Sequence, residues 1–196
     1  MSEIFGLLTD FGDRDPYRGQ LASVLLRRCP SCQILNLSHQ VEPHNILQGA
    51  FFLRGSWPWL PRGCIVLAVV DPGVGSSREI VLLRSGGEYV LAPDNGLLEL
   101  LLRDIPPDGL WRLRTERCSG TSFTFHGRDV FAPLAADLAE GRDPDRLGER
   151  LSGDELVRLP FGEAEPRGDR LEARVLHVDR FGNCVLNIPE SAWGDT

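Results

Sequence analysis

The sequence has no excess of basic residues. Its 196 residues include 21 lysines and arginines against 28 aspartates and glutamates, so the formal net charge is -7. No basic stripe offsets this balance, which argues against nucleic acid as the main partner. The sequence also lacks a long apolar segment and opens MSEIFGLLTDFG without a basic region. We therefore expect neither membrane insertion nor secretion, and a cytoplasmic location.

Patterns typical of metal sites and disulfide frameworks are missing as well. There is no HxH or HExxH pair, so we expect no metal, and a metal-dependent hydrolase has little support. The four histidines lack ligand spacing: His39, His44, His126 and His177. Five irregularly spaced cysteines do not form a disulfide framework. The pair Cys29 and Cys32 has the spacing of a redox site, but it follows a helical pattern rather than opening one, so we interpret it as structural.

Apolar runs alternate along the chain with helical patterns, in the order expected of a layered α/β domain with a central, mostly parallel sheet. Hydrophobic residues make up 42% of the chain, enough to bury one full core. Strands are predicted over residues 4–8, 33–37, 64–70 and 89–92, with a further apolar run at 80–83. Helices are predicted over residues 17–28, 43–53, 97–103 and 128–140.

The composition changes at residues 160–170, PFGEAEPRGDR, which are rich in proline, glycine and charge. We expect an N-terminal α/β domain over residues 1–160, a linker over 161–170 and the start of a small all-β domain over 171–196. Strands are predicted over residues 171–178 and 184–188. Because two or three strands do not make a stable sheet alone, this piece must dock on the first domain, join another subunit, or be a fragment.

Three separated residues form a candidate catalytic site: Asp71, Arg78 and His126. Asp71 directly follows the apolar strand 64–70, at the rim where open α/β sheets bind ligands. Pro72, Gly73 and Gly75 break the strand, and a hairpin-like return would bring Arg78 near Asp71. His126 arrives from a distant segment. Its aromatic neighbour would desolvate the imidazole, and the glycine after it would leave space for a ligand.

The charges of these residues suggest how they could act on water. The guanidinium is a permanent cation that holds an adjacent carboxylate charged and oriented. Water between that carboxylate and a histidine can be aligned and partly deprotonated as it attacks, without a covalent nucleophile. Taken alone, the trio is more simply explained as an ion pair that staples a loop, beside a half-buried histidine.

A second turn, residues 179–183, carries a carboxylate, an aromatic ring and an amide: Asp179, Phe181 and Asn183. These groups could hold a nucleoside. From spacing alone, an ordinary hairpin loop is the simpler interpretation.

Five ordered motifs resemble the S-adenosylmethionine hydroxide adenosyltransferase family, long known as a domain of unknown function and related to the fluorinase and chlorinase. The motifs are TDFG at 9–12, VDPGVGSSR at 70–78, APDNGLL at 92–98, FHGRD at 125–129 and DRFGN at 179–183. The resemblance covers nearly the whole chain. It implies an enzyme that splits S-adenosylmethionine as its substrate, with no cofactor, into adenosine and methionine, and it favours the catalytic interpretation of the trio.

The resemblance also implies residue roles. Asp71, Arg78 and His126 match the residues that position water or hydroxide for attack on C5′ of the ribose. Asp10 matches the carboxylate that binds the ribose hydroxyls; the alternative for an aspartate at this position is a helix cap.

In the turn at 179–183, Asp179 and Asn183 match residues that hold the methionine amino group and the adenine edge. A carboxylate suits an ammonium, and an amide offers a purine both a donor and an acceptor.

This sequence differs from the family pattern in its C-terminal part. Family members carry a longer second all-β domain, which in relatives completes the site across a trimer interface, so a homotrimer is implied if the short segment suffices. Two alternatives remain: a halide-using adenosyltransferase, and a truncated, non-catalytic adenosine-binding protein. Asp71 would repel a halide, whereas water can donate a hydrogen bond to it, so water is the expected nucleophile.

Overall fold

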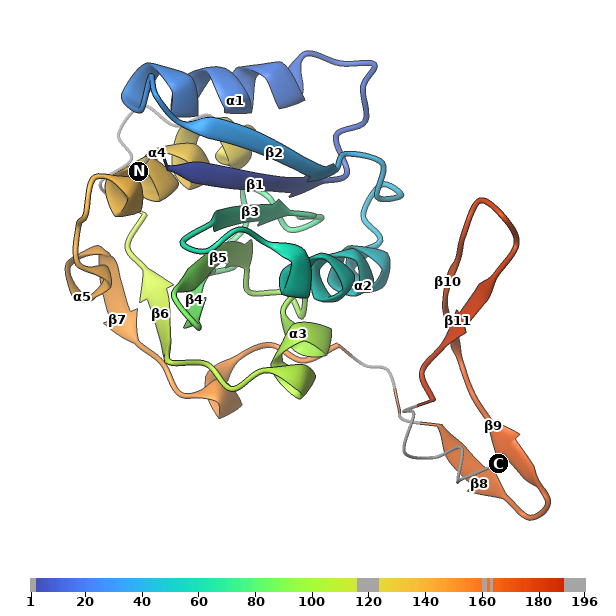
Figure 1. The fold of residues 1–196 in the computed structure, drawn as a ribbon. Coiled ribbons are helices and arrows are strands. Elements are labelled where there is room, and N and C mark those ends of the chain that lie inside the picture. The colour runs from blue at the N-terminus through green and yellow to red at the C-terminus, as the bar shows by residue number, and fades with distance from the viewer. Residues whose placement is uncertain (1–2, 116–123, 160–161, 163, 189–196) are drawn as a thin grey trace. The chain divides into compact units, whose positions relative to one another are not determined.

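The computed structural model describes residues 3–115, 124–159, 162 and 164–188 (Figure 1). The chain divides into two compact units, Met1–Arg158 and Leu159–Thr196. The helices of the first unit are α1 (Tyr17–Arg28), α2 (Ile46–Ser56), α3 (Glu99–Asp104), α4 (Ala132–Ala139) and α5 (Pro144–Leu147). Its strands are β1 (Ile4–Thr9), β2 (Gln33–Ser38), β3 (Ile65–Val69), β4 (Ile80–Ser85), β5 (Glu88–Pro93), β6 (Gly109–Leu113) and β7 (Gly148–Arg150).

The seven strands form one sheet in the order β2-β1-β3-β5-β4-β6-β7. Strands β2, β1, β3 and β5 are parallel to one another, and β4, β6 and β7 continue the sheet in antiparallel pairings. Every residue of β3 is buried, as expected of a continuous apolar strand covered on both faces. The predicted α/β fold class is confirmed.

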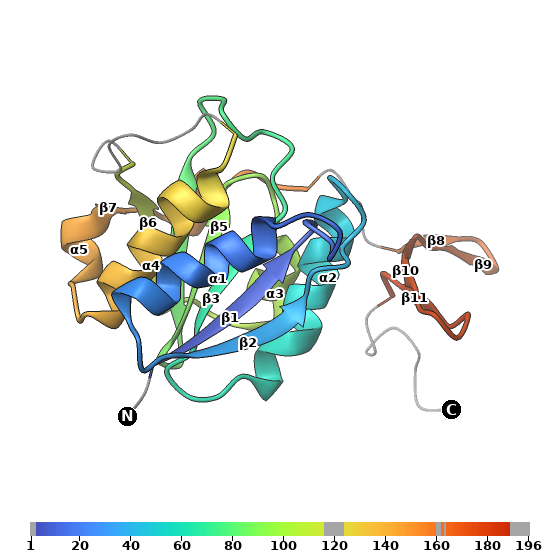
Figure 2. The ribbon, with the colours of Figure 1, turned by 90° about the horizontal axis from the view of Figure 1, so that it is seen from above.

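Helices cover both faces of the sheet. Helices α1 and α4 pack against each other on one face, while α2 and α3 pack together on the other (Figures 1 and 2). Gly49 lets α2 approach the end of β3: a Cβ atom there would lie 3.0 Å from Val70 Cγ2 and 2.8 Å from Leu97 Cδ1. The layers therefore hold the carboxyl ends of the parallel strands in a fixed arrangement.

Several element boundaries differ from the sequence prediction. Helix α2 begins at Ile46 rather than at position 43, because the Asn45 side chain accepts a hydrogen bond from the Gln48 N–H and caps the helix there. The helix predicted over residues 128–140 is divided into a π-helical turn, Gly127–Phe131, and α4. The division occurs next to Pro133, because proline has no N–H with which to make the regular hydrogen bond to the preceding turn. Strands β6 and β7 were not predicted.

The second unit contains two antiparallel hairpins, formed by β8 (Glu165–Arg167) with β9 (Arg170–Glu172) and by β10 (Val175–Val178) with β11 (Cys184–Leu186). Among its described residues, Leu176 is the one buried apolar side chain. Strand β8 lies within the predicted linker. Position 160 of the predicted N-terminal domain, 161 and 163 of the predicted linker and 189–196 of the predicted C-terminal domain lie outside the described residues, and the predicted domain limits stay a prediction.

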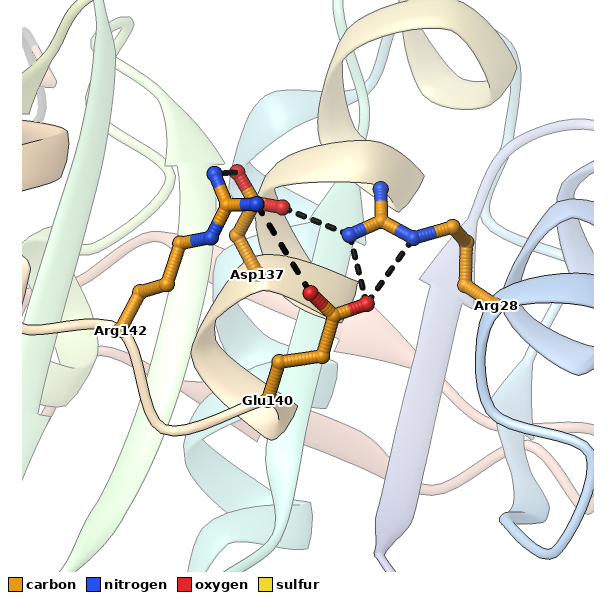
Figure 3. A network of polar contacts seen from close by, with 4 residues as sticks. All are labelled: Arg28, Asp137, Glu140 and Arg142. Atoms are coloured by element: carbon orange, nitrogen blue, oxygen red, sulfur yellow. Dashed lines mark hydrogen bonds and ion pairs between the residues drawn. The ribbon is translucent and has the colours of Figure 1, made fainter.

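A network of charged side chains joins α1 to the end of α4 (Figure 3). The Arg28 guanidinium, in the last turn of α1, lies 2.8 Å from Asp137 Oδ1 and 2.6 Å from Glu140 Oε1. Arg142 donates to the other oxygen of Asp137 at 3.1 Å. The hydrogen bonds to Asp137 and Glu140 raise the pKa of Arg28. Arg28 therefore links two helices, whereas Arg142 bridges residues at the end of one.

We expect Arg28→Ala to lower the free energy of unfolding by about 1 kcal/mol, because the network is partly exposed and its ion pairs are screened by water. For a chain of this size, that loss lowers Tm by about 2–4 °C. Thermal denaturation at low and high salt measures the effect, which should shrink at high salt. Arg142→Ala is the matched control and should cost less, since the contact between α1 and α4 remains; equal losses in both variants would contradict the proposed link.

Candidate active site

Four neighbouring parallel strands each lead into a polar residue. His39 follows β2, Asp10 follows β1, Asp71 follows β3 by two positions and Asn95 follows β5 by two. Because the carboxyl ends of parallel strands meet at one edge of the sheet, these residues gather where α/β folds bind ligands. Asn95 supports this edge directly, since its Nδ2 donates to the Val70 carbonyl at 2.9 Å.

The loop from Asp71 to Arg78 folds back on itself, as predicted. Backbone N–H groups of Val74 and Ser76 donate to the Asp71 and Gly73 carbonyls at 3.2 and 3.1 Å. Arg78 N–H donates to Ser76 Oγ at 3.2 Å. A Cβ atom at Gly73 would lie 3.3 Å from Arg78 Cγ, so glycine permits this close return.

Arg78 is in direct contact with both Asp71 and His126. Arg78 Nε donates to Asp71 Oδ1 at 3.0 Å and to Oδ2 at 2.8 Å, and Arg78 Nη2 also bonds Oδ2. The Asp71 and Arg78 side chains are only 5% and 10% exposed. Arg78 Nη2 lies 2.8 Å from His126 Nδ1. The predicted trio thus forms one hydrogen-bonded unit, in which the guanidinium stands between the carboxylate and the imidazole.

The Arg78 contact fixes the protonation state of His126. A guanidinium has only donors, so Nδ1 accepts and the ring proton lies on Nε2, at the opposite edge of the imidazole. Burial and the charge of Arg78 lower the pKa of His126, against the opposing effects of Asp71 and Asp129. His126 is therefore a neutral histidine that can donate through Nε2.

Asp71 and His126 line a cleft of about 390 Å³. The cleft is lined by Asp10, Phe11, Tyr17, Gln20, His44, Val69, Asp71, Val74, Thr124, Phe125, His126, Gly127 and Arg128. It thus brings the predicted residues Asp10, Asp71 and His126 to a single cavity. Its volume is in the range of small-molecule sites.

Asp10 enters the cleft from the end of β1. Its Oδ2 accepts a hydrogen bond from the His44 N–H at 3.0 Å, while Oδ1 accepts none from the described residues. Helix α1 begins seven residues later, at Tyr17, and Asp10 does not cap it. The carboxylate is therefore available for a ligand.

Gly127, which was expected to leave space for a ligand beside His126, lines the cleft. The position of its missing side chain is not that space, because Phe11 and Leu21 lie there: a Cβ atom would be 3.1 Å from Phe11 Cζ and 3.3 Å from Leu21 Cδ1. Glycine thus lets the segment after His126 pack closely against Phe11 and α1.

The aromatic wall of the cleft was not predicted from the sequence. The Tyr17 ring centroid lies 6.2 Å from that of Phe11 and 5.5 Å from that of Phe125. The Arg128 guanidinium lies 4.9 Å from the Phe125 ring centroid and donates to Gln20 at 3.2 Å. Phe11, Phe125 and Arg128 belong to two of the quoted motifs, but motif order alone does not reveal which side chains share a cavity.

The turn at residues 179–183 lies in the second unit and holds itself together. Asp179 Oδ1 accepts from the backbone N–H groups of Phe181 and Asn183 at 2.8 and 2.9 Å, and Oδ2 accepts from Asn183 Nδ2 at 2.7 Å. The hydrogen bonds from Asn183 and Phe181 lower the pKa of Asp179. The Phe181 side chain is exposed. The assignment of Asp179, Phe181 and Asn183 as substrate-binding residues stays a prediction.

The cysteine pair and the possibility of a metal site can be addressed in the part of the chain that the structure describes. Cys29 is the C-terminal cap of α1, as its sequence position indicated, and burial raises the pKa of the Cys32 thiol. Within the described ranges, no cluster of three His, Cys, Asp or Glu side chains is arranged to hold a metal ion. None of the helices described is long and apolar enough to span a membrane.

The sequence agrees with a family model over residues 5–148, which is described as the SAM hydroxide adenosyltransferase N-terminal domain. The chain belongs to this family. The matched range, residues 5–148, contains Asp10, Asp71, Arg78 and His126, whereas the turn at residues 179–183 lies beyond this range.

Named relatives and a solved structure are similar over most of the chain. The "(R)-S-adenosyl-L-methionine hydrolase" of Thermus thermophilus is 40% identical over 191 residues, covering 92% of this chain and 72% of that protein. The "Fluorinase" of Nocardia brasiliensis is 26% identical, covering 94% and 71%. The crystal structure of an uncharacterized conserved protein from Thermotoga maritima has a TM-score of 0.87 and 33% identity, covering 96% of this chain and 73% of that one.

Proposed function

We propose that this protein is an enzyme that hydrolyses S-adenosylmethionine to adenosine and methionine. The observation that supports the proposal best is the single unit formed by Asp71, Arg78 and His126 beside a cleft that also contains Asp10. A relative at 40% identity carries the name of this hydrolase. The charges and donors of the cleft suit such a reaction.

In the proposed reaction, a water oxygen forms a bond to C5′ of the ribose as the bond from C5′ to sulfur breaks. The electron pair of that bond passes to the sulfonium, so methionine leaves as a neutral thioether and no acid is needed for the leaving group. Asp71 accepts a hydrogen bond from the attacking water and then its proton, and His126 Nε2–H donates to the water oxygen. Catalysis therefore depends on positioning and in-line geometry.

Arg78 has a positioning role in this proposal. Its Nε and Nη2 hold the carboxylate of Asp71, and Nη2 also holds Nδ1 of His126. The guanidinium thereby fixes an acceptor and a donor relative to each other. Asp10 would bind the ribose, because two carboxylate oxygens suit a vicinal diol.

Water is the proposed nucleophile rather than a halide. Asp71 is the negative group next to the reacting position, and a fixed carboxylate repels an anion while accepting a hydrogen bond from water. The similarity to a fluorinase makes halide transfer the alternative to test.

Incubation of the purified protein with S-adenosylmethionine in halide-free buffer, and then with added chloride or fluoride, tests the proposal. The sulfonium epimers should be assayed separately, since the name of the relative gives the R form. We expect adenosine and methionine in equal amounts, unaffected by halide. A 5′-halogenated nucleoside would identify the alternative reaction, and no product from folded protein would contradict catalysis and favour a binding protein.

The expected cytoplasmic location, the homotrimer and the absence of nucleic-acid or membrane partners stay predictions. Light scattering coupled to size-exclusion chromatography, with and without adenosine, would measure the assembly state directly.

A further inference from the structure

A chain of polar side chains that begins at the buried Thr9 and ends at the exposed Asn36 lies next to Asp10. Thr9 Oγ1 and His39 Nδ1 are 2.8 Å apart, and His39 Nε2 lies 2.8 Å from Asn36 Oδ1. Thr9 is fully buried and His39 is 4% exposed. Thr9 is the last residue of β1, Asn36 lies within the adjacent strand β2, and His39 directly follows β2.

The partners of His39 in this chain fit one tautomer of its ring. Asn36 Oδ1 can only accept, so the ring proton of His39 lies on Nε2 and Nδ1 accepts from the Thr9 hydroxyl. Thr9 Oγ1 in turn accepts from the Phe11 N–H at 3.3 Å. Burial and the charge of Arg18 lower the pKa of His39, which keeps the ring neutral.

The same histidine holds both ends of the segment that carries Asp10. Its side chain bonds Thr9, the residue before Asp10, and its backbone carbonyl accepts from the Gly12 N–H at 2.7 Å. Five residues after His39, the His44 N–H donates to Asp10 itself. His44 has φ 68°, the one positive value at a non-glycine residue in the described part of the chain. A left-handed conformation at such a residue is costly and persists where the surroundings enforce it.

We propose that Thr9, His39 and Asn36 form a positioning unit that sets the orientation of the Asp10 carboxylate for the vicinal diol of the ribose. The inference rests on the proposed function, in which Asp10 binds that diol. These three residues act through Asp10 and the backbone of residues 9–12 and not on the reacting atoms. Fixed supporting hydrogen bonds are what keep a binding group in its productive geometry.

A purely structural role would stabilise the protein without affecting recognition of the diol, so the test compares two nucleosides. Binding of adenosine and of 2′,3′-dideoxyadenosine is measured by calorimetry, together with kcat and KM for S-adenosylmethionine. The wild-type protein should prefer adenosine by about tenfold or more, because the dideoxy analogue lacks the hydroxyls that bond the carboxylate.

Thr9→Val removes the hydroxyl and keeps the shape of the side chain. We expect it to reduce the preference for adenosine about tenfold, to raise KM with a smaller change in kcat, and to leave the affinity for dideoxyadenosine within about twofold. Thr9→Ser restores the hydroxyl and should restore the preference. Asn36→Ala, at an exposed position, is a second variant with little risk to folding and should reduce the preference in the same direction.

A normal preference for adenosine in folded Thr9→Val and Asn36→Ala would overturn the inference and show a structural role only. Wild-type protein that forms adenosine from S-adenosylmethionine yet binds both nucleosides equally would also overturn it, while the proposed reaction would stand. Wild-type protein that forms no adenosine would instead refute the proposed function, and the inference with it.

Discussion

Asp71→Asn is expected to lower kcat for adenosine formation by about 10²- to 10⁴-fold, the range of general-base catalysis. Asparagine keeps the size of the side chain but cannot accept the proton of the attacking water. Steady-state kinetics with chromatographic separation of adenosine measures the loss. KM should change less, because Asp71 acts on the water rather than on the ribose.

The control for this variant must separate lost catalysis from lost folding. Removing one partner of a largely buried ion pair destabilises proteins by about 3–5 kcal/mol, so circular dichroism and a thermal melt accompany the kinetics. Asp104→Asn is the matched variant: it breaks an exposed pair with Arg54 outside the cleft and should retain normal turnover. Folded Asp71→Asn with near-normal kcat would contradict the mechanism.

His126→Ala is expected to abolish most turnover without unfolding the protein, because both ring nitrogens have a role. Nδ1 accepts from Arg78, and Nε2–H faces the proposed water. His126→Asn separates these roles, since its side-chain oxygen can replace Nδ1 as acceptor while its shorter amide does not reach the position of Nε2–H. We expect both variants to lose about 10²-fold or more in kcat. Recovery of activity in His126→Asn would show that His126 only holds Arg78.

The pH profile gives an independent check on His126. Burial and Arg78 disfavour the imidazolium, so the folded-state pKa lies below the ordinary value of 6.5. The neutral, active form therefore persists at pH 6.5, and kcat/KM should fall only as the pH drops through the lowered pKa. The acid limb due to this residue should disappear from the residual activity of His126→Asn. A rate that rose on acidification would contradict a neutral histidine.

Much of the fold could be predicted because its signals are local. Helix α1 has the predicted limits, Tyr17–Arg28, since Pro16 precedes it and basic residues end it. Strand β6 was missed because it begins at Gly109, directly after a turn rich in proline, and carries only five residues. Strand β7 has three residues, too few to show a periodic pattern.

The candidate site could be predicted where its residues share a loop or a motif, but not where they meet through the packing of distant segments. Asp71 and Arg78 share one loop, and the FHGRD motif indicated His126. The Thr9–His39 contact was not predicted, because residues 30 positions apart meet only through the parallel register of β1 and β2. The one signal of this contact in the sequence was Thr9, a single polar residue at the end of the apolar strand β1. The position of Gly127 against Phe11 likewise depends on how α1 packs.

The two contacts within the trio, Asp71–Arg78 and Arg78–His126, close loops of different length. Asp71 and Arg78 are seven positions apart, whereas Arg78 and His126 are 48 apart. Loop-closure entropy grows with the logarithm of length, so the longer loop costs about 1.7 kcal/mol more than the shorter one. The ion pair thus closes only the short loop between β3 and β4. The entropic cost of completing the trio lies in bringing in His126, a contact that requires the π-helical turn and α4 to be docked on the sheet.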